Sequence, residues 1–252
     1  MVTKTIKQQY DEWVSKVCSF LVEESLKLNV TCGTFQSKPI LDYHPDVVFL
    51  GYNPHETGSA LPLETIQARF YEGNREFYSD KRKDWSIWEP LRWSFEWAGY
   101  TKPVEDGHFV FFNAIYFGTN NINDFKKLPN SKILTDQCLH FSGEVIQNIF
   151  KPKCVVCLSV PDCFDILNRK FHFSDVKRVN TLQDTDANLI KYAMEKTANG
   201  WKIPYCSRRI IKKGLWNGIS TYGIPHPSGS LSNNDRAAIA LYLRSEMQNL
   251  GL

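Results

Sequence analysis

The chain has 252 residues and a net charge of only +3, with 42% hydrophobic and 13% aromatic residues. This composition is typical of a folded globular protein and excludes extended disorder. There is no run of eighteen apolar residues, and the first residues lack the apolar core of a signal peptide. We therefore expect no membrane partner and an intracellular location, cytoplasmic or in the nucleoid if the source is bacterial. The seven cysteines are scattered and odd in number, which favours reduced thiols over a disulfide framework.

Helical patterns alternate with short apolar runs along the chain. In chain order we expect a helix at 10–28, a strand at 47–52, helices at 63–78 and 85–97, a strand at 109–116, a helix at 134–150, strands at 154–160 and 219–224, and a last helix from 233 or 234. This order predicts an α/β fold of three αβα layers, with a central four-stranded, mostly parallel sheet. Residues 1–252 are expected to form a single domain, with a candidate insertion at about 170–213.

Three polar segments lie at the ends of the predicted strands. GYNPHETG follows the first strand, FFNAIYFGTNN ends the second, and HPSGSLSNN follows the last. Ligands of such sheets bind outside the carboxyl ends of the strands. Taken singly, Asn53-Pro54 can be a turn, His226 a surface residue and Asn113 a satisfied polar group of the sheet. Their occurrence together favours a shared site.

These segments resemble a known family. Gly51-Tyr52-Asn53-Pro54 and His226-Pro227-Ser228 are similar to the two signature motifs of the uracil-DNA glycosylase superfamily. Asn53 matches the single-strand-selective monofunctional subgroup, whose first motif reads G-x-N-P, and Asn113 matches the base-reading asparagine. The resemblance implies a uracil-DNA glycosylase-like fold and a base-excision repair enzyme that removes uracil, or a related damaged base, from DNA. It implies no cofactor and no metal.

The chemistry of these side chains is consistent with that activity. Cleavage of an N-glycosidic bond leaves a cationic sugar and an anionic base. The amide of Asn53 can orient a water, and His226 can donate a hydrogen bond to the base oxygen that becomes negative. Asn113 can accept from N3–H of uracil and donate to O4, once the base has been flipped out of the stack. Neither motif contains a lysine, so we expect a monofunctional enzyme without a Schiff base.

Further residues are assigned to base and DNA binding. The base-binding candidates beside Asn113 are His55, Tyr52 and Leu63. The candidates for DNA contacts are Ser228, Gly229, Ser230, the apolar wedge Leu231, and the basic residues Arg208, Arg209, Lys212 and Lys213. The segment from Lys196 to Asn234 has no acidic residue and can follow a phosphate backbone, although a solvated hairpin has the same composition.

His55 and Glu56 depart from the family pattern. The residue after the motif proline faces the C5 edge of the base in the family, so His55 bears on substrate choice, and Glu56 is unexpected near phosphate. One alternative is therefore a glycosylase for hypoxanthine, xanthine or a 5-substituted uracil. Two others are a DNA-binding relative that senses lesions without cutting, and an α/β enzyme that acts on a free nucleoside or another small molecule. We expect a monomer.

Cys154 and Cys157 have the spacing of a metal-binding pair. Residues three apart on a strand point to opposite faces, however, so we expect no metal site there.

Overall fold

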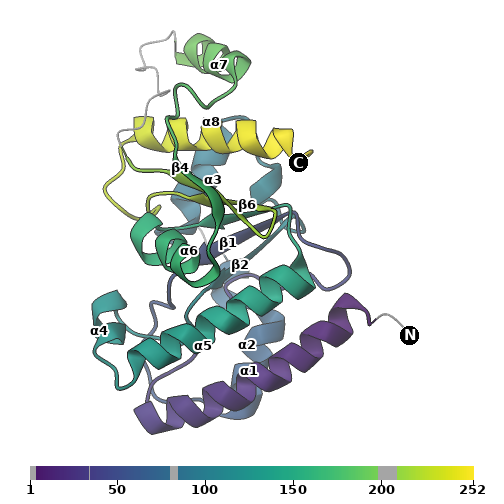
Figure 1. The fold of residues 1–252 in the computed structure, drawn as a ribbon, viewed down its shortest axis with the longest axis vertical. Helices are drawn as coiled ribbons and strands as arrows, with labels where there is room; N and C mark the ends of the chain where they lie inside the picture. The colour runs from purple at the N-terminus through teal and green to yellow at the C-terminus, as the bar shows by residue number, and fades with distance from the viewer. Residues whose placement is uncertain (1–3, 34, 80–84, 198–208) are drawn as a thin grey trace.

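The computed structural model describes residues 4–33, 35–79, 85–197 and 209–252, apart from the side chains of residues 196 and 197. Its centre is a mixed sheet of six strands in the order β2-β1-β3-β6-β5-β4 (Figure 1). The strands are β1 (Val47–Gly51), β2 (Phe109–Asn113), β3 (Cys154–Cys157), β4 (Ser174–Arg178), β5 (Lys212–Trp216) and β6 (Ile219–Gly223). The α/β class is confirmed, whereas the predicted number of strands is wrong.

The four predicted strands correspond to β1, β2, β3 and β6, which pair in parallel with one another. Two further strands, β5 and β4, extend the sheet beyond β6 in antiparallel pairing. The hairpin between β5 and β6 turns at Asn217 and Gly218, both with positive φ (48° and 87°), which is the backbone of a tight two-residue turn. β4 lies within the segment 170–213, so part of that candidate insertion belongs to the central sheet.

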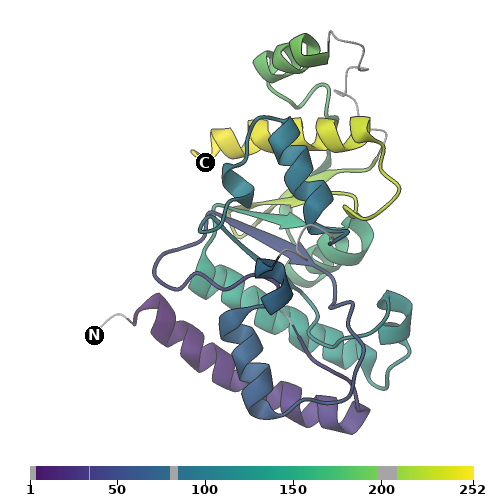
Figure 2. The same ribbon diagram turned by 180° about the vertical axis from the view of Figure 1, so that it is seen from behind.

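Helices cover both faces of the sheet, as Figures 1 and 2 show from opposite sides. On one face, α1 (Ile6–Leu28), α2 (Leu63–Glu72), α5 (Ser131–Glu144) with the continuing turn η4 (Val145–Phe150), and α6 (Asp165–Phe171) enclose a first core. On the other face, α3 (Trp88–Trp97) and α8 (Asn233–Asn249) enclose a second core. The remaining elements are η1 (Arg75–Tyr78), η3 (Lys102–Val104), α4 (Ile122–Lys126), η5 (Val160–Phe164) and α7 (Ala187–Thr197).

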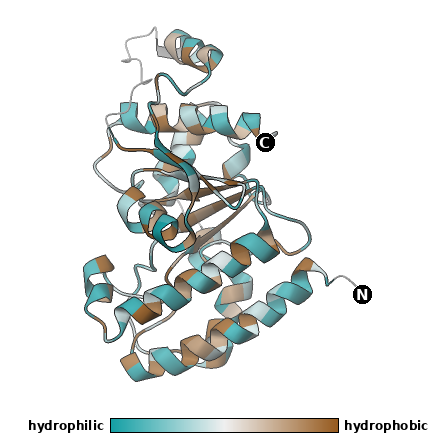
Figure 3. Cartoon of the chain, viewed as in Figure 1, coloured by the Kyte–Doolittle hydropathy of each residue, from teal (hydrophilic) through white to brown (hydrophobic). Residues whose placement is uncertain are grey.

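Burial on both faces explains the continuous apolar runs. All residues of β1, β2 and β3 are buried, and successive side chains alternate between the two cores. The inner strands of the sheet are accordingly brown in Figure 3, whereas hydrophilic and hydrophobic residues alternate along the helices. Among the described residues, no helix is long and apolar enough to cross a membrane.

The predicted helix at 63–78 is interrupted. α2 ends at Glu72 because Gly73 adopts a φ of +68°, and a Cβ there would lie 2.7 Å from the carbonyl carbon of Ser37. The chain then passes Asn74, whose side chain accepts a hydrogen bond from the backbone of Glu76 at the start of η1. This break leaves polar side chains of 72–76 beside the ends of β1 and β2.

Candidate functional site

The carboxyl ends of four parallel strands form the edge at which the predicted motifs meet. Gly51 is in register with Asn113 on one side, and β3 lies between β1 and β6. Adjacent strands are about 4.8 Å apart, so the ends of β1 and β6 are separated by roughly 10 Å. The loops that carry Asn53 and His226 therefore leave the sheet on the same side but not from neighbouring strands.

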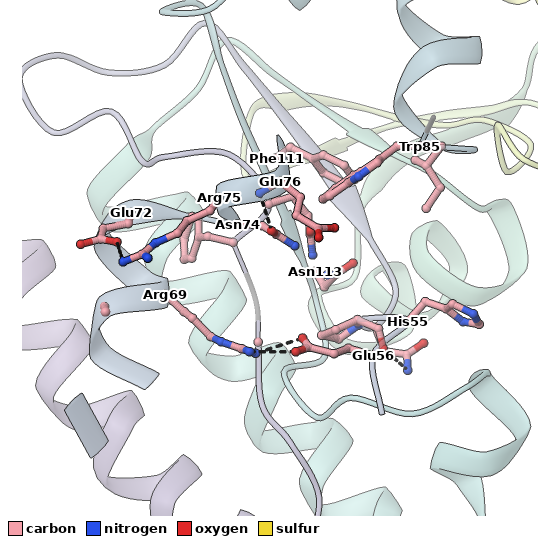
Figure 4. A pocket seen from close by; sticks show the side chains of 18 of the residues that line it. His55, Glu56, Arg69, Glu72, Asn74, Arg75, Glu76, Trp85, Phe111 and Asn113 are labelled. Carbon is pink, nitrogen blue, oxygen red and sulfur yellow. Dashed lines mark hydrogen bonds and ion pairs between the residues drawn. The ribbon is translucent and has the colours of Figure 1, made fainter. Parts of the chain in front are cut away.

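A cavity of about 960 Å³ opens beside the ends of β1 and β2 (Figure 4). Its walls come from the loop after β1, α2, the segment 72–76, residues 85–87, the end of β2, and Gly33, Phe35 and Gln36. Asn53 and Asn113 both line it, together with His55, Glu56 and Trp85. The volume lies at the upper end of the range of about 300–1,000 Å³ usual for small-molecule sites.

The side chain of Asn53 is held in one orientation. Its Nδ2 donates to Thr119 Oγ1 at 2.9 Å and lies 3.4 Å from the carbonyl of Pro54. The Thr119 hydroxyl in turn donates to the carbonyl of Asn121 at 2.9 Å. Because Nδ2 is engaged in this way, the amide oxygen Oδ1 is left to accept a hydrogen bond from a water.

Asn113 ends β2 on the same face as Phe111 and is 5% exposed. Its Oδ1 lies so close to the backbone of Gly51 that a Cβ at that position would approach it to 2.4 Å. Real Cβ atoms essentially never make so short a contact, so the glycine of the first motif allows the base-reading candidate to fold against β1. The position of the Asn113 side chain thus depends sterically on the glycine at position 51.

His226 lies in an exposed turn after β6. Its Nδ1 is 2.7 Å from Ser228 Oγ, and the turn is closed by a hydrogen bond from the amide of Gly229 to the carbonyl of His226, at 2.9 Å. The protein shields part of the ring from water, which lowers the pKa of His226. The negative charge of Asp162 acts in the opposite direction and raises it, but by less. When Ser228 donates to Nδ1 of the neutral ring, the proton lies on Nε2, which can then act as a donor.

His226 and two of the base-binding candidates are absent from the described cavity lining. The Tyr52 ring packs in the first core at 6.3 Å from Phe125, and its burial raises the pKa of the phenol to about 12. Leu63 is the first residue of α2 and is 40% exposed. His55 does line the cavity but is exposed, and in Figure 4 its ring points away from Asn113.

The loop residues predicted to contact DNA differ in their exposure to solvent. Ser228, Gly229 and Ser230 are exposed, and Arg209 donates to the carbonyl of Ser230. Leu231 is instead partly buried against the second core, where it lines a small apolar crevice with Ile239 and Leu243. In this structure Leu231 therefore does not project as a wedge.

Of the predicted basic residues, Lys212 and Lys213 are engaged by acidic side chains on different helices. Lys212 pairs with Asp165 of α6 at 2.7 Å, and Lys213 pairs with Glu246 of α8, so their side chains lie on opposite faces of the sheet. Arg209 is exposed, and Arg208 lies outside the described residues. Pairing with acidic residues from distant helices could not be read from the basic segment itself.

Several contributors to this edge have no signal in the sequence. Thr119 orients Asn53, Asp162 affects His226, and Arg69 of α2 pairs with Glu56. Each depends on a contact between different elements of the fold. The predicted opposite orientation of Cys154 and Cys157 is confirmed, because Cys154 belongs to the second core and Cys157 to the first.

Comparison with known proteins does not assign this chain to a family. The sequence matches no protein-family model, and no curated protein is significantly similar to it.

Proposed function

We propose that this protein is a monofunctional DNA glycosylase that hydrolyses the N-glycosidic bond of uracil, or of a closely related damaged base. The main support is that Asn53 and Asn113 line one cavity, at the edge where the His226 loop also leaves the sheet. Neither amide is a strong base or nucleophile. The arrangement suits a reaction in which the departing base leaves first and water needs only to be positioned.

In the proposed reaction, the flipped nucleotide places its base against Asn113 and its sugar beside Asn53. The Oδ1 of Asn53 orients a water toward the anomeric carbon. The bond from that carbon to the base breaks, and its electron pair leaves with the base, while the water oxygen forms the new bond and its proton passes to solvent. Nε2–H of His226 donates to the base oxygen as negative charge develops.

The first experiment measures base release from an oligonucleotide that carries one uracil, as a single strand and opposite guanine or adenine. Alkali then cleaves the abasic sites. The proposal predicts cleavage that requires alkali and is nearly abolished by Asn53→Ala. If excess enzyme releases no uracil although DNA binding is intact, the uracil assignment is wrong, and a glycosylase for another lesion or a non-catalytic DNA-binding relative is favoured instead.

A glycosylase for a larger base is the second candidate. The cavity volume of about 960 Å³ exceeds what one pyrimidine ring needs, and the exposed His55 leaves the rim open. A panel containing hypoxanthine, xanthine and 5-substituted uracils in the same oligonucleotide separates the two candidates. Faster release of one of these bases than of uracil would favour the second candidate.

A further inference from the structure

Glu56 and Arg69 form a two-point ion pair in the wall of the cavity. Arg69 Nη2 lies 2.8 Å from Glu56 Oε1, and Arg69 Nη1 lies 2.9 Å from Glu56 Oε2 (Figure 4). Glu56 is three residues after Asn53 in the same loop, whereas Arg69 belongs to α2. The positive charge of Arg69 thus comes from α2 to the carboxylate of Glu56, the acidic residue nearest to Asn53 in the sequence.

The arginine is held in place independently of Glu56. Its Nη1 also donates to the carbonyl of Cys32 at 2.8 Å. A Cβ at Gly33 would lie 3.2 Å from both Arg69 Nη1 and Glu56 Oε2, so the pair packs closely on the backbone there. The amide of Thr31 bonds to the carbonyl of Gly58 at 2.9 Å, which fixes the two backbone segments to each other. The guanidinium is thus a preset partner for the carboxylate.

A carboxylate at this position opposes DNA binding unless its charge is neutralised. Phosphates flank the nucleotide whose sugar would lie beside Asn53. At low salt the negative charge of Glu56 would repel these phosphates, because the two charges are weakly screened from each other. A two-point arginine contact neutralises a carboxylate more completely than a single contact does. We infer that Arg69 is a positioning residue that masks the charge of Glu56, so that the DNA backbone can approach Asn53. The inference rests on the proposed function.

The neighbouring pair of Glu72 and Arg75 provides a matched control. It lines the same cavity, but it has one contact of 3.4 Å and Arg75 is 89% exposed in its side chain. Such exposed pairs have little effect on stability or local charge. Glu72→Gln therefore changes the net charge as Glu56→Gln does, without affecting the two-point pair.

The test compares DNA affinity and the KM for uracil release among the wild type, Arg69→Gln, Arg69→Gln/Glu56→Gln and Arg69→Gln/Glu72→Gln. At low salt, Arg69→Gln should weaken binding on the order of three- to tenfold, and less at high salt where charges are screened. Adding Glu56→Gln should restore affinity to within about twofold of the wild type, whereas adding Glu72→Gln should not. Thermal unfolding monitors the fold of each variant.

A purely structural role for Arg69 predicts a different pattern. The double variant Arg69→Gln/Glu56→Gln would then bind as weakly as Arg69→Gln, and this result would overturn the inference, as would equal rescue by Glu72→Gln. If Arg69→Gln does not fold, Arg69→Lys keeps the charge but replaces the two-point contact with a single one, and it should weaken DNA binding at low salt by less than about threefold. A loss of about threefold or more in a folded Arg69→Lys protein would also overturn the inference. A wild type that binds no DNA would instead refute the proposed function, and the inference with it.

Discussion

At the amino-terminal edge of the parallel strands, Asp46 binds two basic side chains, whereas at the carboxyl edge the polar side chains face a cavity and loops. Asp46 Oδ2 is 2.7 Å from His108 Nδ1, and Asp46 Oδ1 is 3.0 Å from Lys153 Nζ. These three residues precede β1, β2 and β3 and connect the starts of the strands. Their polar groups are directed at one another.

At the carboxyl edge, the polar side chains of Asn53 and His226 are each held by a hydroxyl group through one of their polar atoms. Thr119 engages only the nitrogen of the Asn53 amide, and Ser228 engages one nitrogen of the His226 ring. In each case the contact orients the side chain and leaves another polar atom able to interact with a ligand. Residue type alone therefore does not indicate a site. What distinguishes the carboxyl edge is oriented polar groups with bonding capacity left, beside a cavity.

The two histidines give the largest expected difference between the edges. His226→Ala removes the proposed donor to the departing base and should lower the rate of uracil release by on the order of 10²–10³. His108→Ala, the matched control, should lower the unfolding temperature and leave the rate at 25 °C unchanged. Single-turnover rates on the uracil oligonucleotide and thermal unfolding check both. A His226→Ala enzyme as fast as the wild type would remove this loop from the mechanism.

Gly51→Ala tests the steric link between the two asparagines. The new Cβ would lie 2.4 Å from Asn113 Oδ1, so the amide must move. We expect uracil release to fall by on the order of 10- to 100-fold because the displaced amide no longer holds the base, and the overpacked position should also lower the free energy of unfolding by about 1–3 kcal/mol. Gly58→Ala in the same loop is the control, since its Cβ would make an ordinary 3.6 Å contact with Thr31. A folded Gly51→Ala protein with full activity and discrimination against cytosine would show that Asn113 does not read the base.

Thr119→Val should have a smaller effect. The substitution keeps the shape of the side chain but removes the partner of Asn53 Nδ2, so the amide can rotate and orient the water less well. We expect kcat to fall on the order of tenfold with KM little changed, because one neutral hydrogen bond is lost. Thr119→Ser retains the hydroxyl and should recover most of the rate. Equal losses in both variants would point to packing rather than to orientation of Asn53.

The sequence allowed the four parallel strands to be predicted because burial on both faces produces unbroken apolar runs. β4 was missed since all five of its residues are exposed and read as a polar loop. β5 begins with Lys212 and Lys213, whose acidic partners come from α6 and α8. The Asn217-Gly218 turn was a local signal for the hairpin. It identifies one turn, however, and does not show where the sheet ends.

The candidate site was predictable to a similar extent. The rule that ligands bind at strand ends brought together Asn53, Asn113 and His226, and two of these three line the described cavity. The orienting partners were not predictable, because Thr119 and Arg69 reach the loop after β1 from other elements. The inward packing of Leu231 also depends on α8, which begins two residues later in the sequence.

Asp46→Asn tests the amino-terminal edge and should have the smallest effect on activity. Burial alone would raise the pKa of Asp46, but its hydrogen bonds with His108 and Lys153 prevail and lower it from the usual 3.8. The unfolded chain therefore binds more protons near that pH, and the stability that ionised Asp46 contributes is present above pH 3.8 and is lost as the pH falls through the lower folded pKa. We expect Asp46→Asn to destabilise the protein by on the order of 1 kcal/mol at pH 7, with uracil release unchanged. Urea unfolding of both proteins between pH 7 and pH 3 should show a difference that shrinks below about pH 4. A loss of base release in a stable Asp46→Asn protein would mean that the two edges are coupled, and the division between a structural edge and a functional edge would no longer hold.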